Sequence, residues 1–465
     1  MEPPTLGLVM RKFLFLNFRS VAAVKHWFLA RFTPAGRLVF SAMVLCAFFG
    51  INTGVNLAYQ GFTFLAAMVV IAFWGSMFFR SPFSVRRTAP RFGTVGVRLS
   101  YRMVVTNRRR KKAGGLFLSE RMADPRPGFA EFSAAREPLQ DRRNLFDRAV
   151  GYHRWMWLVA LNRRAEAEMV PVPAVGPGDS AEVTVSLTPR RRGRLDLPGV
   201  TVSRTDPLGL YRALRVEKEP GSILVLPRRY RLPPIDLPGR RRHQPGGVAL
   251  ASSVGDAEEF VSLRDYRPGD PIRQIHWRSW AKAGKPIVKE FQEEYFVRHA
   301  LVLDTFWPVK GDERFEEAVS VAASFVAAVD TRESLLDLLF VGTEAYCFTG
   351  GRGLAQEDRM LEILASAEVC PDRPFSTLRA LTRQRAPQLS GCILVLLDWD
   401  DQRQELVRIL QRHLLPILVV AVVGEGESTG LDPGPLKTRP ENFVPLEAGR
   451  IEEGLERWRR RTSNH

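Results

Sequence analysis

The chain has 465 residues, enough for two or three domains that each bury a core of their own. Apolar residues make up 45% and charged residues 25%, which excludes a largely disordered chain. A formal net charge of +17 suits nucleic acid, anionic lipid or a basic surface without a single partner, so charge alone selects no function. The four cysteines have no zinc-binding spacing, which favours a reducing compartment.

Residues 1–37 form a basic segment ahead of the first apolar run. Its positive side chains are Arg11, Lys12, Arg19, Lys25, Arg31 and Arg37. Between Phe13 and Phe32 these charges are spaced among Phe, Leu, Val and Trp residues, a mixture typical of a helix that lies in the interface of a membrane. The sequence therefore predicts a juxtamembrane segment that contacts lipid.

Residues 38–80 are expected to form a transmembrane hairpin. Leu38–Ala58 and Gly61–Phe79 contain no charged side chain, and each run has roughly the 20 residues needed to cross a bilayer. The turn near residues 56–60 is short, so the two spans must be antiparallel. Small side chains that allow close approach are Gly50, Gly54, Ala66 and Gly75. Basic residues flank both ends of the hairpin, which predicts two passes with the soluble domains in the cytoplasm. The late start and the second run disfavour a signal peptide.

Residues 84–230 read as a β-sandwich-like domain. Apolar and polar residues alternate along Val97–Val105, Ala181–Leu187 and Ile223–Leu226, with Pro, Gly and Asn between the runs. Residues 108–148 are polar, rich in Arg and irregular, so a long surface insertion is expected there.

Residues 231–254 form a linker rich in Pro, Gly and Arg, and residues 255–465 alternate strand and helix patterns. Alternating elements predict an open, largely parallel sheet with helices on both faces. The expected strands are His299–Asp304, Leu335–Val341, Cys392–Leu397 and Ile417–Val423. The expected helices are Phe315–Val329, Glu357–Ala367, Gln402–His413 and Ile451–Arg461.

Common catalytic motifs fail when their context is tested. Residues 426–430 match the nucleophile elbow of serine hydrolases, but the Pro-rich residues that follow cannot begin the helix that this motif needs. The chain has no GxxxxGK[ST] loop and no HExxH motif, so it is not itself a P-loop ATPase or a metalloprotease of that type. We therefore predict a non-catalytic protein.

The densest group of polar and aromatic residues follows the linker. It contains Glu259, Arg264, Asp265, Tyr266, Asp270, Arg273, His276, Trp277, Lys289 and Glu290. Carboxylates and guanidiniums at these spacings can form bidentate ion pairs that hold one chain path. The same residues can form a surface that binds a partner, where Arg and Trp are favoured anchors. Both readings stay open.

This segment resembles the signature of the bacterial family catalogued as domain of unknown function 58. The resemblance rests on residues 259–266, 268–270, 273–277 and 288–291, on Arg192-Gly193-Arg194 and residues 206–211 upstream, and on the N-terminal hairpin. It covers nearly the whole chain. It implies a protein of the bacterial cytoplasmic membrane, associated with MoxR-type AAA+ ATPases in chaperone-like assembly of other proteins.

The resemblance also implies that the C-terminal region is similar to a von Willebrand factor A domain. Such domains bind a divalent cation such as Mg²⁺ through an Asp-x-Ser-x-Ser loop. Here the loop begins at Asp304, and Phe306 and Pro308 replace the two serines. Asp398 supplies a second carboxylate at the end of another strand. Two carboxylates provide too few oxygens, so no cofactor is expected and a Mg²⁺ site is doubtful.

The leading hypothesis is a non-catalytic, membrane-tethered adaptor whose partner is a protein, either an AAA+ ATPase or its client. The first alternative is an uncharacterised enzyme that uses Asp265, Asp270 and His276. The second alternative is a nucleic-acid-binding protein, which ranks last because the basic residues are scattered and form no known binding motif.

Overall fold

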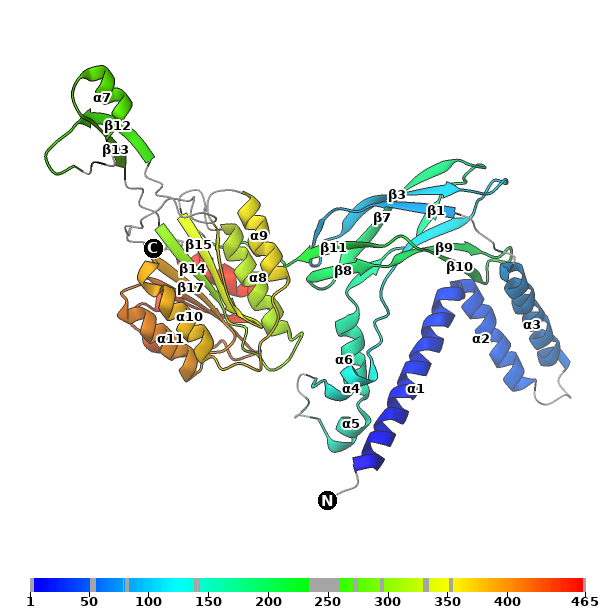
Figure 1. Cartoon of the computed structure of the whole chain (residues 1–465). Coiled ribbons are helices and arrows are strands. Elements are labelled where there is room, and N and C mark those ends of the chain that lie inside the picture. Colours follow the sequence, from blue (N-terminus) through cyan, green and yellow to red (C-terminus); the bar gives the residue numbers. More distant parts are fainter. Residues whose placement is uncertain are drawn as a thin grey trace. The chain divides into compact units, whose positions relative to one another are not determined.

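The computed structural model describes residues 4–50, 56–77, 79, 83–137, 140, 143–233, 259–270, 272, 275–292, 297–328, 334–350 and 354–462. The chain divides into two compact units, Met1–Leu226 and Pro227–His465. The first unit combines N-terminal helices with antiparallel sheets, and the second contains a six-stranded sheet flanked by helices (Figure 1). Most of the predicted linker, residues 234–254, and the first residues of the signature segment lie outside the described residues.

The N-terminal helices are α1 (Pro4–Arg31), α2 (Pro34–Phe49) and α3 (Asn56–Met77). Thr33 caps α2, because its hydroxyl oxygen accepts the N–H of Gly36 at 3.0 Å, and Pro34 stands at the first helical position. A Cβ atom on Gly36 would lie 2.0 Å from the carbonyl oxygen of Leu210. Only glycine therefore permits α2 to begin so close to the β-sheet domain.

The predicted pair of membrane spans is only partly correct. Helix α3 is long and apolar enough to cross a bilayer over Leu57–Met77. Only 6% of its apolar stretch is buried, whereas the core helix of a soluble domain would be mostly buried. Helix α2 ends at Phe49 and has 16 residues, about 24 Å at 1.5 Å per residue, which is short of the hydrocarbon thickness. The predicted turn at residues 56–60 is wrong, because α3 already begins at Asn56.

Of the small residues expected to let α2 and α3 approach closely, one lies between them, one contacts another element and one lies outside the described residues. Gly50 does lie close to α3, since a Cβ atom there would be 3.4 Å from the nitrogen of Tyr59. A Cβ atom on Gly75 would instead contact Pro207 of the β-sheet domain, and Gly54 lies outside the described residues. Gly61, which was not expected to contribute, faces the sulfur of Cys46.

Three sheets form the β-sheet domain, with strand orders β1-β3-β7-β5, β10-β9-β4-β6 and β2-β11-β8. Neighbouring strands are antiparallel except for β2 and β11. Their inward side chains share one core that includes Met103, Leu118, Val185, Val202 and Ile223. The strands are β1 (Phe83–Thr88), β2 (Phe92–Thr94), β3 (Leu99–Asn107), β4 (Leu116–Arg121), β5 (Ala165–Ala167), β6 (Val170–Val172), β7 (Ser180–Pro189), β8 (Gly193–Leu197), β9 (Gly199–Thr205), β10 (Arg212–Glu217) and β11 (Gly221–Leu226).

The region predicted as an irregular insertion, residues 108–148, contains ordered elements. Strand β4 pairs with both β9 and β6 inside the second sheet. Helices α4 (Phe129–Ala134), α5 (Leu145–Val150) and α6 (Tyr152–Asn162) follow it. The prediction failed because β4 has only six residues beside an Arg-rich stretch, and because α4 and α5 are too short to display a helical period.

The second unit contains a sheet with strand order β16-β15-β14-β17-β18-β19. All neighbours are parallel except β16, which pairs antiparallel with β15 at one edge. The predicted strands are present, and the two edge strands, β16 and β19, were not predicted. The strands are β14 (Val297–Leu303), β15 (Ser334–Val341), β16 (Ala345–Gly350), β17 (Gly391–Leu396), β18 (Ile417–Val423) and β19 (Phe443–Glu447).

Helices cover both faces of this sheet. Leu378 of α10 and Leu406 of α11 share a core with Val302 and Leu394 of the strands. On the other face α8 packs against α9, and Phe325 of α8 contacts the ring of Trp458 in α12 (Figure 1). The helices are α8 (Glu313–Ala328), α9 (Leu354–Ala365), α10 (Ser376–Arg385), α11 (Asp401–Arg412) and α12 (Ile451–Thr462), and α10 was not predicted.

Candidate functional site

The signature segment folds into a small module, which we call the signature module: β12 (Glu259–Asp265), α7 (Trp277–Ala283) and β13 (Ile287–Gln292). The two strands pair antiparallel, with Arg264 opposite Val288. The N–H of His276 donates to the carbonyl of Ile287 at 2.8 Å, which joins the start of α7 to β13. Gly284 ends α7 with a φ of 70°, a conformation that favours glycine.

Arg264 and Asp270 form the strongest ion pair of the module. The two guanidinium nitrogens of Arg264 donate to the two carboxylate oxygens of Asp270 at 2.7 and 2.8 Å. Asp270 also accepts the N–H of Arg267 at 2.8 Å. The hydrogen bonds from Arg264 and then from Arg267 lower the pKa of Asp270 to about 2. This pair closes the loop after β12.

The three residues of the enzyme hypothesis each have a different partner. Asp265 pairs with Lys285 at 2.7 Å, Asp270 pairs with Arg264, and Nδ1 of His276 lies 2.7 Å from the hydroxyl of Ser279. Among the described residues no hydrogen bond or ion pair joins one member of this set to another.

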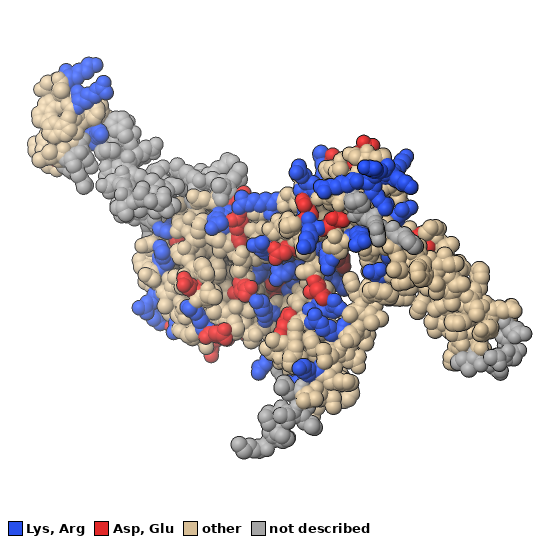
Figure 2. Space-filling view, turned by 45° about the vertical axis from the view of Figure 1, so that its right-hand side comes forward, with Lys and Arg blue, Asp and Glu red and all other residues tan. Residues whose placement is uncertain are grey.

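The signature module also exposes apolar side chains on its surface. Trp277 is 60% exposed and stacks on Trp280 with ring centroids 5.3 Å apart, and Ile272 is 70% exposed. Arg278 and Lys282 of α7 are also exposed, and Lys and Arg side chains gather on this module in Figure 2. Trp277 thus presents an exposed aromatic ring beside cations, while Trp280 is half-buried.

The other predicted residues of the segment are only partly described. Tyr266 and Lys289 are half-buried, and the N–H of Tyr266 donates to the carbonyl of Pro286 at 3.0 Å. Arg273 and the side chains of Glu259 and Glu290 lie outside the described residues.

Asp304 follows the carboxyl end of β14, which lies between the parallel strands β15 and β17, so the chain connections from this edge lead to opposite sides of β14. Open α/β sheets bind ligands at such a switch point. One carboxylate oxygen of Asp304 accepts the N–H of Phe306 at 2.9 Å. The other accepts the N–H of Leu397 at 3.1 Å and Nε of Arg403 at 2.7 Å. Burial raises the pKa of Asp304, and the positive charge of Arg403 opposes that change.

Arg403 connects three segments at this edge of the sheet. Besides Asp304 it donates to the carboxylate of Asp400 at 2.7 Å and to the carbonyl of Phe306 at 3.3 Å. Its guanidinium lies over the ring of Phe375, 5.1 Å from the centroid. The side chains of Arg403 and Asp304 are 8% and 0% exposed, so the ion pair is buried.

A divalent cation does not fit this edge of the sheet. Both oxygens of Asp304 already accept hydrogen bonds, and a buried guanidinium stands beside them. Phe306 and Pro308 bring no side-chain oxygen, and Asp398 accepts the N–H of the adjacent Trp399. Mg²⁺ keeps several water ligands but needs a carboxylate oxygen from the protein, and both oxygens of Asp304 are already engaged in hydrogen bonds.

Sequence reasoning did not identify Arg403. It follows Asp400, which caps α11 by accepting the N–H of Arg403 at 2.9 Å. An arginine in the first turn of an amphipathic helix usually faces solvent, so its spacing carried no signal. Only the tertiary structure shows that the side chain of Arg403 is buried against Asp304 at the end of β14.

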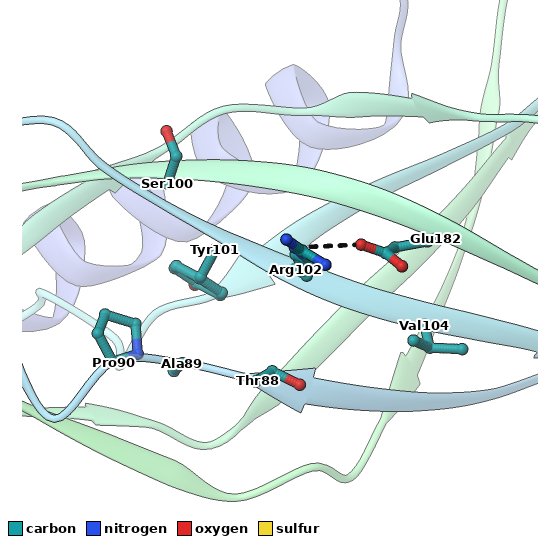
Figure 3. A pocket seen from close by; sticks show the side chains of 8 residues that line it. All are labelled: Thr88, Ala89, Pro90, Ser100, Tyr101, Arg102, Val104 and Glu182. Carbon is teal, nitrogen blue, oxygen red and sulfur yellow. Dashed lines mark ion pairs between the residues drawn. The ribbon is translucent and has the colours of Figure 1, made fainter.

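Two further features of the sequence and surface bring together no reactive group. Ser428, in the elbow-like motif, donates to the carboxylate of Glu447 at 3.2 Å, and turns rather than a helix follow it. A surface hollow of about 510 Å³ lies on the β-sheet domain beside Tyr101 (Figure 3). At this hollow Arg102 forms an exposed ion pair with Glu182 at 3.3 Å.

Residues 262–422 match the family described as "Protein of unknown function DUF58". A stretch of 187 residues is 28% identical to the uncharacterized protein YeaD of Bacillus subtilis (strain 168), and it covers 40% of this chain and 45% of YeaD. The match thus spans less than half of that relative. The family match begins inside β12 and ends inside β18, so it includes most of the signature module and the Asp304 edge.

Two solved structures have only remote similarity. They are an exo-β-N-acetylglucosaminidase of the GH20 class from Vibrio harveyi and an inactive mutant of the same enzyme, 8% and 9% identical. Each match covers 74% of this chain and 57% of the other, with TM-scores of 0.14 and 0.13. These scores support no argument about fold or activity.

Proposed function

We propose that the protein is a non-catalytic, membrane-tethered adaptor that binds a protein partner through the signature module. The partner is a MoxR-type AAA+ ATPase or its client, and the energy for assembly comes from that ATPase. The observation that carries the proposal is the exposure of Trp277 and Ile272 beside the cations of α7. Exposed aromatic anchors flanked by charge contribute most of the free energy in many protein interfaces.

In this proposal the second unit is a von Willebrand factor A-like domain, and three features of its sheet support that assignment. Its central strands are parallel, helices cover both faces, and Asp304 follows the first strand of the sheet. In this proposal the Asp304–Arg403 pair replaces the bound cation, so partner binding does not require a divalent metal. Addition of a chelator should then leave the affinity unchanged.

The proposed location is the cytoplasmic membrane of a bacterium, with two passes and the soluble parts in the cytoplasm. Helix α3 supports an anchor, and the basic residues on both sides of the hairpin support this orientation. The enzyme hypothesis receives no support from the separate pairing of Asp265, Asp270 and His276. Nucleic-acid binding stays a lower-ranked prediction.

Affinity capture from mild-detergent extracts tests the adaptor proposal. The intact protein should retain an AAA+ ATPase, whereas Trp277→Ala combined with Ile272→Ser should lose it. Tyr346→Ala is a matched control, because Tyr346 is a 43% exposed aromatic of the same unit outside the signature module. Equal capture by all three proteins, each shown to be folded by circular dichroism, would argue against the signature module as the binding surface.

A further inference from the structure

One face of α1 is mostly apolar and uncovered, and the exposed Asn17 and Ser20 interrupt it between Leu16 and Val21. Its side chains recur at helical spacing, and each is between 48% and 66% exposed: Val9, Met10, Phe13, Leu16, Val21, Val24 and Trp27. We call these residues the α1 stripe. It runs for roughly 27 Å, at about 1.5 Å of rise per residue. Soluble proteins rarely expose an apolar surface of that length.

The opposite face of α1 is covered by α4, α5 and α6 of the same unit, which we call the helical insertion. Phe15 is buried, and its ring centroid lies 5.4 Å from that of Phe129 and 5.6 Å from those of Phe132 and Trp155. Arg19 donates to the carbonyl of Pro127 at 3.2 Å. The insertion thus holds α1 by the Phe15 face and leaves the α1 stripe free to contact something else.

The charge of α1 indicates what that surface contacts. The helix carries five Lys or Arg residues, at positions 11, 12, 19, 25 and 31, and no acidic residue. Arg11, Lys12 and Arg19 lie three or four positions from Phe15, and Lys12 and Lys25 border the apolar face on its two sides. The guanidinium of Arg31 lies 5.7 Å from the ring centroid of Trp27 at the end of the stripe. An apolar face flanked by cations, with Trp and Arg at one end, suits the boundary between acyl chains and anionic headgroups.

The position of α1 agrees with a lipid surface. Phe32 directly follows α1 and packs with Ala72 of α3 and Tyr211 of the β-sheet domain. Figure 1 shows α1, α2 and α3 extending from the same side of the sheets. Lipid around the apolar helix α3 would therefore also lie beside α1.

We propose that α1 lies in the interface of an anionic bilayer, with the α1 stripe among the acyl chains and the insertion clamped on its cytoplasmic face. This contact adds to the anchor formed by α3 and orients the β-sheet domain against the membrane. It is independent of the partner that the signature module binds.

Single-cysteine labelling of the full-length protein tests this proposal. Cys46 and Cys347 are first replaced by Ala, which leaves the two buried cysteines. Val24→Cys then places a solvatochromic NBD dye on the stripe, and His26→Cys places it about 200° around the same helix, also at an exposed position. Both variants are reconstituted in vesicles of phosphatidylcholine with phosphatidylglycerol, and quenching by doxyl-labelled lipid is measured.

We expect a blue-shifted emission at position 24 and quenching about threefold stronger than at position 26. In vesicles of phosphatidylcholine alone, quenching at position 24 should decrease, because the cations of α1 lose their counterpart. Equal quenching at the two positions in folded protein would overturn the proposal. Protection of position 24 from both lipid and aqueous quenchers would overturn it as well, because a protein would then cover the stripe.

Discussion

At the scale of single residues, the Asp304–Arg403 pair determines the chemistry of the sheet edge. A buried carboxylate without a counter-charge costs several kcal/mol, and metal-binding domains meet that cost with a cation. Here Nε of Arg403, 2.7 Å from Asp304, supplies the positive charge from within the chain. In the proposed function this pair takes the place of a bound cation, so the sheet edge would not depend on metal supply.

Removing this guanidinium should destabilise the second unit. Arg403→Ala leaves Asp304 buried without its partner, and we expect a loss of about 3–5 kcal/mol in the free energy of unfolding. Denaturant titration of the full-length protein in detergent measures this loss. Arg408→Ala is the control, because Arg408 forms an exposed ion pair with Glu405 on the same helix and should change stability by about 0.5 kcal/mol or less. Similar values for the two variants would contradict a buried role for Arg403.

The stability of the Arg403→Ala variant should also depend on pH. Burial raises the pKa of Asp304, so the folded state of the variant binds a proton more readily than the unfolded state. Its stability deficit should therefore shrink as the pH falls and grow as the pH rises. A deficit that is constant between acidic and neutral pH would show that Asp304 is not the cause.

Glu317 offers a second test of pH dependence. Burial raises its pKa to about 7, and the nearby Glu313 adds to the rise. The folded protein thus holds a proton that the unfolded chain releases near pH 4.5, and stability falls as the pH rises through this window. Glu317→Gln should add on the order of 1 kcal/mol at pH 8, since Glu317 is only half-buried, and nothing at pH 4. Thermal melting against pH, with the exposed Glu453→Gln as control, measures the difference.

At the scale of elements, the helical insertion acts as a clamp on α1. Its contact with α1 is an aromatic cluster around Phe15 and Phe132, both buried. The sequence predicted an insertion at residues 108–148 but not its helices. Short helices gain their stability from tertiary packing rather than from local pattern. The sequences of α4 and α5 therefore show no clear helical periodicity.

Phe132→Ala should release the insertion from α1. Loss of a buried aromatic ring costs about 3–5 kcal/mol, which is enough to open a small cluster without unfolding the sheets. We expect faster tryptic cleavage after Arg148, with the fragment of the second unit unchanged. Phe146→Ala removes a ring that is 75% exposed and should leave the cleavage rate unaltered. Unchanged cleavage in the Phe132 variant would mean that the insertion is held by other contacts.

The elements predicted well are those with long buried runs. Residues 417–423 of β18 and the 16 residues of α8 display their period clearly, because one fully buried strand or one helical face spans the whole element. The signature module was visible as a group of charged residues, yet its strands and the exposure of Trp277 were not. Charged residues pair across turns, and one sequence does not reveal which side of a short helix stays exposed.

At the scale of the whole molecule, the proposed two-pass topology of α2 and α3 can be tested in cells. A cysteine at Leu57, 81% exposed at the start of α3, should react with an impermeant maleimide added outside spheroplasts. A cysteine at Lys112 in the β-sheet domain should react only after lysis. Labelling of both positions only after lysis would mean that α2 and α3 enter the bilayer without crossing it, which the short α2 allows.

The central claim is that the signature module of a membrane-anchored chain binds an AAA+ ATPase. The most direct test measures the dissociation constant between a purified MoxR-type ATPase and the full-length protein in lipid nanodiscs. We predict that Trp277→Ala weakens binding by about thirtyfold, equivalent to about 2 kcal/mol, while Tyr346→Ala and a chelator change nothing. Equal affinity for the intact protein and the Trp277 variant, or no binding by the intact protein, would contradict the account.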